Sequence, residues 1–285
     1  MQQHPIEGIQ SNVTLYQVWL DAPPLDHPKD EVYEGWLTAE ERTRLARFRV
    51  EKPRFAFLMG RATLRSVLGQ HLQVDGRRIV LRENAYGRPE LADKNTRLFF
   101  NLSHTSGLLA LALSRDYEIG VDVECRLRST DTDAIAEHVF APDELAELRH
   151  FDDPSERHRH FFKLWTLKEA YIKARGMGLA LPLKDMAFTR NPTAAATATA
   201  KPLAAPASAP EALKHDTFDF HFGATRSVEA CPEAWSFGLY TPSPIHQMAV
   251  AARHVAAPRT GIASSPRIRV FDHYWPPPPP AGSSR

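Results

Sequence analysis

Two short segments carry the side chains whose types and spacing could do chemistry. The first, residues 120–124, reads Gly-Val-Asp-Val-Glu and so alternates apolar and acidic side chains. In a strand, alternate side chains leave on one face, so Asp122 and Glu124 would stand side by side with their Cα atoms roughly 7 Å apart. Ile119, Val121 and Val123 would then face a core. Two adjacent carboxylates repel each other unless a cation lies between them, so this strand predicts a cation site.

The second segment reads Trp-Thr-Leu-Lys-Glu-Ala over residues 165–170 and is followed by Lys173. On a helix, Glu169 and Lys173 lie one turn apart and share a face. Three carboxylates and a lysine suit a hard divalent metal that holds a phosphate. Each part alone has an ordinary interpretation, because strand acids often form a solvated face and a Glu–Lys pair is often a surface ion pair.

Composition excludes several classes of protein. The 285 residues include 35 Lys plus Arg and 34 Asp plus Glu, so the chain has almost no net charge that could attract nucleic acid. A binding site for an anion must therefore be a local cluster of basic side chains. No apolar run approaches the length of about 20 residues needed to span a membrane. The start of the chain lacks the regions of a signal peptide, so we expect a cytoplasmic protein without a membrane partner. The 43% apolar content suffices for the core of one large domain or two ordinary ones.

The first half of the chain is predicted to present two helices and a hairpin. Thr38 and Glu41 have the spacing of a capping box, which favours a helix through Arg47. The other expected elements are a helix from about Pro53 to Leu68, an extended stretch at 78–82, a turn at 84–89, and buried strands at 98–101 and 108–113 that pair as a hairpin.

The second half is expected to begin near Asp116. Its longest helix starts after Asp153, with Pro at the first helical position, and Gly176 can end it. Lys168 projects from within the apolar arc of this helix, so it either snorkels outward or points at an anion in a cleft. The other expected elements are a strand at 117–124, helices at 131–139 and from Pro142, and strands at 218–222, 235–240 and 248–252.

Two stretches have the composition of mobile segments. Residues 191–210 are rich in Ala, Pro and Thr and predict a linker or a surface insertion. Residues 253–285 predict a mobile tail, most firmly for the proline run and the residues after it, 276–285. An alternative remains for the near part of the tail, where the apolar side chains between Ile268 and Trp275 could dock on the body.

Taken together, the motifs resemble those of 4′-phosphopantetheinyl transferases of the larger, monomeric Sfp type. The resemblance covers roughly Thr38 to Leu183 and then thins. It is carried by four blocks in the order of the family, and their joint occurrence makes the signal specific. The blocks are Gly87-Arg88-Pro89, Asn101-Leu102-Ser103-His104, Gly120 to Glu124, and Trp165 to Ala170 with Lys173 and Gly176 to Leu179.

The resemblance implies an α+β fold, a pseudo-dimer of two similar subdomains, each a small antiparallel sheet with packed helices. Residues 1–115 would form the half that binds the adenosine side of coenzyme A, and residues 116–252 the half with the metal and the catalytic helix. The implied reaction moves the phosphopantetheine arm of coenzyme A to a serine of an apo acyl or peptidyl carrier protein. It releases adenosine 3′,5′-bisphosphate and requires Mg²⁺, for which Mn²⁺ could substitute.

The resemblance also implies residue roles. Asp122, Glu124 and Glu169 would be the metal ligands, with Glu169 also the base, directly or through a bound water. Lys173 would meet the pyrophosphate and take part in catalysis. The remaining coenzyme A contacts would come from Arg44, Gly87, Arg88, Pro89, Asn101, Ser103 and His104, with Arg88 near the adenine and its ribose phosphate.

One position departs from the family pattern. Some relatives carry a second basic residue one turn before Arg44, where this chain has Glu41. That exchange removes a cation from the predicted 3′-phosphate contact, and Arg54 and Arg61 on the next helix are candidates to replace it.

Two other functions are compatible with parts of this pattern. One is a catalytically silent coenzyme A or carrier-protein binding module of the same fold, which the intact acidic triad disfavours. The other is a different metal-dependent enzyme of nucleotide phosphates, such as a pyrophosphatase.

Overall fold

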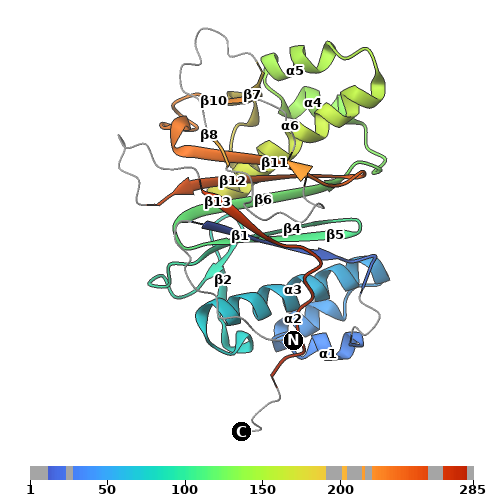
Figure 1. Cartoon of the computed structure of the whole chain (residues 1–285), viewed down its shortest axis with the longest axis vertical. Helices are drawn as coiled ribbons and strands as arrows, with labels where there is room; N and C mark the ends of the chain where they lie inside the picture. Colours follow the sequence, from blue (N-terminus) through green and yellow to red (C-terminus); the bar gives the residue numbers. More distant parts are fainter. Residues whose placement is uncertain are drawn as a thin grey trace.

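Two sheets stacked between two groups of helices form the protein. The computed structural model describes residues 12–23, 28–190, 201–203, 214–215, 220–255 and 266–280. Figure 1 shows the layers: α1 to α3 lie below the sheet that contains β1, β4 and β5, and α4 to α6 lie above the sheet that contains β6, β11 and β12. The structure therefore confirms the predicted α+β class with small antiparallel sheets and packed helices.

The N-terminal half is built on a strand, a long helix and a hairpin. Thr38 closes the predicted capping box with Glu41, and the predicted hairpin forms with Gly107 in its turn at φ 82°. Strand β1 was not predicted. The elements are β1 (Asn12–Trp19), α1 (Asp30–Glu34), α2 (Ala39–Leu45), α3 (Glu51–Leu72), the 3-10 helix η1 (Gly76–Arg78), β2 (Leu81–Glu83), β3 (Pro89–Leu91), β4 (Phe99–Thr105) and β5 (Leu108–Ser114).

The C-terminal half repeats this plan. Its long helix begins after Asp153 and ends at Gly176, whose φ of 63° is the left-handed value that favours glycine, as predicted. The elements are β6 (Tyr117–Cys125), α4 (Thr132–Val139), α5 (Pro142–Arg149), α6 (Pro154–Arg175), η2 (Gly178–Ala180), η3 (Leu183–Asp185), β7 (Met186–Thr189), β8 (Lys201–Pro202), β9 (Lys214–His215), β10 (His221–Ala224), η4 (Pro232–Ala234), β11 (Trp235–Ser243) and β12 (His246–His254).

The two main sheets share one topology. In the first, the strand order β1-β5-β4 places the strand before the long helix beside the last strand of the hairpin. In the second, the order β6-β12-β11 does the same, and every neighbouring pair in these triplets is antiparallel. The same unit, a strand, a long helix and a hairpin, therefore occurs twice.

The sheets pack face to face over a shared core. Apolar side chains of β1 and β5, such as Leu15 and Leu108, are fully buried against those of β6 and β12, such as Val121 and Val250. The outer face of the first sheet is covered by α3 and that of the second by α6. Strand β5 is therefore buried on both faces, which agrees with its nearly unbroken apolar sequence.

The predicted mobile tail is an ordered part of the fold over its described residues. Strand β13 (Arg267–Phe271) pairs in parallel with β1, and Ile268 is only 2% exposed. Tyr274 donates its amide to Gln17, and Trp36 donates its indole N–H to the carbonyl of Pro277. The tail prediction is thus corrected for 266–280, and also for residues 253 and 254, which belong to β12. The alternative, in which the apolar residues dock on the body, is what the structure has.

The Ala-rich stretch 191–210 lies largely outside the described residues. Within it, β8 pairs in parallel with β11, and Leu203 is buried in the core between the sheets. These three residues therefore belong to the folded body.

No helix in the described part of the chain is both long enough and apolar enough to cross a membrane.

The docking of β13 yields a stability prediction. Ile268→Ala should lower the free energy of unfolding by about 2–5 kcal/mol, because it removes buried methyl groups from a packed core. Arg267→Ala, at the exposed neighbouring position on the same strand, should change it by less than about 0.5 kcal/mol. Urea unfolding of both variants measures the difference, and equal stability of the two would mean that the strand is not docked in solution.

Candidate active site

Helix α6 lies directly against β6, the edge strand that carries the predicted acidic pair. The approach is closest at Gly120, where a Cβ atom would overlap the carbonyl oxygen of Ala170. Glycine is needed there because no other residue lacks the Cβ atom. Asp122 and Glu124 follow at alternate positions and therefore leave β6 on the side of α6, where they meet Lys173 and Trp165.

Asp122, Ser103 and Lys173 form a polar cluster that joins the two halves. The Lys173 ammonium lies 2.5 Å from Asp122 Oδ1 and donates to Ser103 Oγ at 2.9 Å. The Ser103 hydroxyl donates to Asp122 Oδ1 at 3.0 Å. Asp122 is 3% exposed, and its second oxygen, Oδ2, has no hydrogen-bond partner among the described residues. A buried carboxylate oxygen without a partner is costly, so Asp122 Oδ2 is an acceptor that the described protein groups leave unsatisfied.

The two glutamates beside this cluster, Glu124 and Glu169, have raised pKa values. Burial raises the pKa of Glu169 to about 7, the Asp122 and Glu124 carboxylates add to the rise, and Lys173 opposes it. Burial, followed by the Asp122 charge, also raises the pKa of Glu124, although Trp165 donates its indole N–H to the Glu124 carboxylate at 3.2 Å. Glu169 itself makes no hydrogen bond or ion pair with another described residue. Its carboxylate is therefore free to take a proton.

The predicted metal ligands lie near one another but do not form a ligand cage. Among the described residues, no group of three or more His, Cys, Asp or Glu side chains is arranged to hold a metal ion. The donor chemistry still fits a hard divalent cation, since Mg²⁺ takes carboxylate oxygens together with waters and phosphate oxygens. Asp122, Glu124 and Glu169, with Lys173 beside them, are called the acidic cluster below, and the unpartnered Asp122 Oδ2 and the raised pKa values of the two glutamates are consistent with room for a further cation there.

A groove in the N-terminal half is lined by three of the side chains predicted to contact phosphate, Arg44, Arg61 and His104. It consists of a pocket of about 230 Å³ and an adjoining one of about 650 Å³, which share Arg44, Phe57, Arg61 and Pro89 as lining residues. The guanidinium groups of Arg44 and Arg61 lie 5.1 and 5.5 Å from the centre of the Phe57 ring. Two like charges on one ring repel each other, so an anion between them would be bound favourably.

The buried position of Arg61 and the arginines around it affect its pKa. Burial lowers the pKa of Arg61 from its usual range, and Arg44 and Arg65 lower it further, whereas Glu41 opposes the shift. Glu41, the departure from the family pattern, forms a two-bond contact with Arg65 at 2.8 and 3.1 Å and so ties α2 to α3. Arg61 lines the groove beside Arg44, and its role as a compensating cation stays a prediction. Arg54 does not line the groove, because it is paired with Asp30 and Glu34.

The predicted coenzyme A ligands lie in two places, and Asn101 belongs to both. Arg44, Pro89, Asn101 and His104 all line the smaller pocket, and Gly87 lies in the turn before it with φ 82°. The side chains of the second set are bound to the other half of the protein. They belong to Asn101, which accepts the amide of Val121, to Ser103, which accepts the amide of Val123, and to Arg88, which donates to two backbone carbonyls of the other half and one of its own.

Two aromatic residues of the site were not predicted. Phe57 lies four residues before Arg61, a spacing that allows a ring and a cation to meet on one helix face. Trp165 is partly buried, and its indole N–H donates a hydrogen bond to Glu124. The sequence carries no signal for that bond, because the two residues meet only when α6 packs on β6.

Lys168 follows neither of its two predicted alternatives. It is 1% exposed, pairs with the fully buried Glu144 at 2.8 Å, and donates to the carbonyls of Leu183 and Met186. Glu144 in turn accepts the amides of Ala141 and Phe188. Lys168 therefore stabilises the packing of α6 against α5 and β7, away from the acidic cluster.

Comparison with known proteins gives matches along most of the described chain. The family model described as "4′-phosphopantetheinyl transferase superfamily" matches residues 118–224, and the one described as "4′-phosphopantetheinyl transferase, N-terminal" matches residues 29–116. These two segments meet between β5 and β6, where the two repeats of the fold also meet.

Three curated relatives illustrate the range of similarity. The 4′-phosphopantetheinyl transferase HetI of Nostoc sp. is 34% identical over 199 residues, which are 68% of this chain and 83% of HetI. The 4′-phosphopantetheinyl transferase Sfp of Bacillus subtilis is 30% identical over 59% of this chain and 73% of Sfp. The human L-aminoadipate-semialdehyde dehydrogenase-phosphopantetheinyl transferase is 28% identical over 55% of this chain and 56% of its own length.

The raised pKa of Glu169 predicts a pH-dependent stability. Its folded value of about 7 exceeds the ordinary 4.5, so the unfolded chain releases this proton first and wild-type stability falls as pH rises from about 4.5 through 7. Glu169→Gln removes this loss. With a chelator present, the free energy of unfolding of Glu169→Gln minus that of wild type should therefore be larger at pH 8 than at pH 4. The increase should be on the order of 2–3 kcal/mol.

Urea unfolding at the two pH values measures this difference. The matched control is Glu156→Gln, an exposed glutamate of the same helix, which should show no such gain. A Glu169→Gln variant with the same pH dependence as wild type would contradict the raised pKa.

Proposed function

The chain belongs to the 4′-phosphopantetheinyl transferase family, and we propose that it performs the reaction of that family at the join of its two halves. It transfers the 4′-phosphopantetheine arm of coenzyme A to a serine hydroxyl of an apo acyl or peptidyl carrier protein and releases adenosine 3′,5′-bisphosphate. The observation that carries this proposal is the position of β4. Its Ser103 contacts Asp122 and Lys173 in the acidic cluster, and the next residue, His104, lines the basic groove.

The groove suits the adenosine end of coenzyme A. Arg44 and Arg61 present two positive charges where the 3′-phosphate would bind, and His104 is exposed at the end nearer the acidic cluster. Pro89 and the Gly87 turn offer backbone that can approach a flat base. A ligand bound this way has its pyrophosphate directed toward Lys173.

Asp122, Glu124 and Glu169 are the proposed ligands of Mg²⁺, or of Mn²⁺ in its place. A bound divalent cation acts as a Lewis acid on the pyrophosphate and balances the charge of the three carboxylates. The unpartnered Oδ2 atom of Asp122 is the support for this assignment.

The side chains supply positioning and proton transfer. Lys173, held between Asp122 and Ser103, provides a positive charge for the pyrophosphate, on which charge accumulates as the bond to the leaving phosphate breaks. The serine oxygen forms the new bond to the phosphorus of the pantetheine arm, and its proton passes to Glu169. The pKa of about 7 belongs to the site without a divalent cation, and a cation bound there would lower it, so the Glu169 carboxylate would be ionised and able to accept a proton near neutral pH.

Partners and location follow from this function. We expect the chain to act as a monomer, because both halves of the site come from one polypeptide, and to reside in the cytoplasm with its substrates. Carriers of fatty-acid, polyketide and nonribosomal peptide synthesis all bear the required serine. A silent binding module is disfavoured by the activity of the relatives, and neither nucleic acid nor a membrane is an expected partner.

The transfer reaction can be tested by mass. Incubation with coenzyme A, Mg²⁺ and an apo carrier should add one phosphopantetheine to the carrier. Asp122→Asn keeps the shape and the Ser103 contact but removes a charge, and it should lower kcat/KM by about 100-fold or more. Mg²⁺ should raise the melting temperature of wild type but not of this variant. Hydrolysed coenzyme A with an unmodified carrier would indicate a pyrophosphatase, and no change in either would indicate a silent module.

The groove can be tested by separating binding from chemistry. Arg44→Ala removes a charge-assisted contact worth about 1.5–3 kcal/mol, so the KM for coenzyme A should rise roughly 10- to 100-fold with little change in kcat. Arg47→Ala, an exposed neighbour that does not line the groove, is the control and should leave both constants unchanged. A loss of kcat alone in Arg44→Ala would remove Arg44 from the adenosine site.

A further inference from the structure

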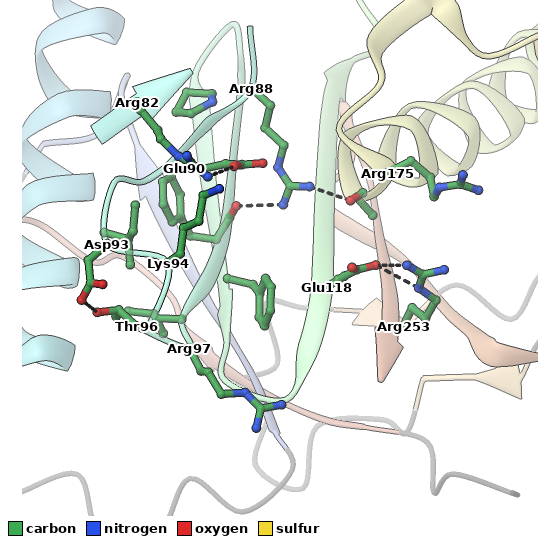
Figure 2. Close-up of a pocket in the computed structure, with 16 residues that line it drawn as sticks. Arg82, Arg88, Glu90, Asp93, Lys94, Thr96, Arg97, Glu118, Arg175 and Arg253 are labelled. Atoms are coloured by element: carbon green, nitrogen blue, oxygen red, sulfur yellow. Dashed lines mark hydrogen bonds and ion pairs between the residues drawn. The ribbon is translucent and has the colours of Figure 1, made fainter. Parts of the chain in front are cut away.

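A second crevice lies between the two halves, beside the C-terminal end of α6. It has a volume of about 330 Å³ and is lined by six cationic side chains and three acidic ones. Most of these cations are bound to protein groups: Arg253 pairs with Glu118, Arg175 with Glu229, and Arg82 with Glu90. Figure 2 shows that the Arg88 side chain extends from the N-terminal half across this crevice, where its guanidinium donates to the carbonyl of Ala174 in the other half. The crevice is therefore a junction between the halves rather than a vacant anion site.

Arg88 binds the backbone of three elements at once. Its guanidinium donates to the carbonyl oxygens of Ala174 at 2.6 Å, Ile119 at 3.2 Å and Phe100 at 3.4 Å. These carbonyls belong to α6, to β6 and to β4. Each of the three elements carries residues of the acidic cluster or of the groove.

The end of α6 is a favourable place for a cation. The last carbonyls of a helix have no partner within the helix, and the helix dipole places negative charge there. Arg88 satisfies the carbonyl of Ala174, and Asn84 donates its side-chain amide to the carbonyl of Gly176 at 2.8 Å. The β2–β3 hairpin of one half therefore caps the catalytic helix of the other.

Asn84 also arranges the turn that presents Arg88. Its side-chain oxygen accepts the amides of Tyr86 and Arg88. Gly176 leaves room for both side chains, since a Cβ atom there would lie 2.8 Å from Arg88 Cδ and 3.0 Å from Asn84 Nδ2. The hairpin and the helix end are thus fitted to each other.

We infer that Arg88, ordered by Asn84, is a positioning residue that aligns Lys173 and Glu169 of α6 with Asp122 of β6 and Ser103 of β4. The carbonyl that it holds belongs to the residue next to Lys173. This role replaces the contact with the ribose phosphate that the sequence predicted for Arg88. The inference rests on the proposed function, because its consequence is a change in the rate of transfer.

Lysine cannot perform this role. A guanidinium is planar and carries five N–H donors in a fixed fork, whereas an ammonium is a compact point charge on a flexible stem. Arg88→Lys keeps the positive charge near the groove but loses the simultaneous bonds to three carbonyls. A displacement of catalytic groups by about 1 Å can cost on the order of 100-fold in rate.

The test compares Arg88→Lys with Lys94→Ala, a variant of an exposed lysine in the same crevice. Arg88→Lys should lower kcat at least tenfold and change the Kd for coenzyme A, measured by calorimetry, less than threefold. Asn84→Ala should shift the same constants in the same direction, and it tests the inference if Arg88→Lys does not fold. Lys94→Ala should match wild type. A rise in Kd and KM with unchanged kcat would make Arg88 a ligand of coenzyme A and overturn the inference, as would unchanged constants.

Hydrogen exchange gives a readout that does not depend on activity. The amide of Gly176 is bonded to the carbonyl of Ile172 in the last turn of α6. Its exchange should become at least tenfold faster in Arg88→Lys and stay unchanged in Lys94→Ala. Equal exchange in the two variants would overturn the positioning role. Wild-type protein that transfers nothing to any apo carrier would instead contradict the proposed function, whatever the exchange shows.

Discussion

The structure depends on how two sheet edges are joined. Strands β4 and β6 belong to different sheets, and side chains connect them: Asn101, Ser103 and Thr105 of β4 accept the amides of Val121, Val123 and Cys125 at 2.9, 3.3 and 3.0 Å. Alternate residues of one strand thus meet alternate amides of the other. Buried amides must find acceptors, so these three side chains set the register of one half against the other.

That register determines the electrostatics of the site. Ser103, while it accepts the amide of Val123, donates to Asp122 and receives a hydrogen bond from Lys173. The serine therefore links the join to the acidic cluster. The three carboxylates outnumber the cations near them, which are the Lys173 ammonium and the exposed Arg128 guanidinium paired with Glu124, and burial together with the neighbouring carboxylates raises the pKa values of Glu124 and Glu169. A site of this kind favours a divalent cation and a substrate that brings phosphate oxygens.

The two repeats have the same topology but different surfaces. The first surrounds its long helix α3 with arginines, and the groove beside it is suited to an anion. The second places acids on β6 and α6. Parallel edge strands, β13 and β8, extend each sheet at the side away from the join. Chemistry at the join therefore needs both repeats in one relative position, which the β4–β6 contacts and the Arg88 junction maintain.

The sequence by itself determined the acidic strand, the helix with Glu169 and Lys173, the caps at Thr38 and Gly176, and the family. These are local patterns of period 2 or 3.6, of capping chemistry and of motif order, and they need no knowledge of distant contacts. Only the tertiary structure decided what Ser103, Arg88 and Ile268 do. Each has partners far along the chain: Asp122 for Ser103, the end of α6 for Arg88, and β1 for Ile268. A polar or apolar residue type specifies that a partner is needed, and the packing of the chain selects which one it is.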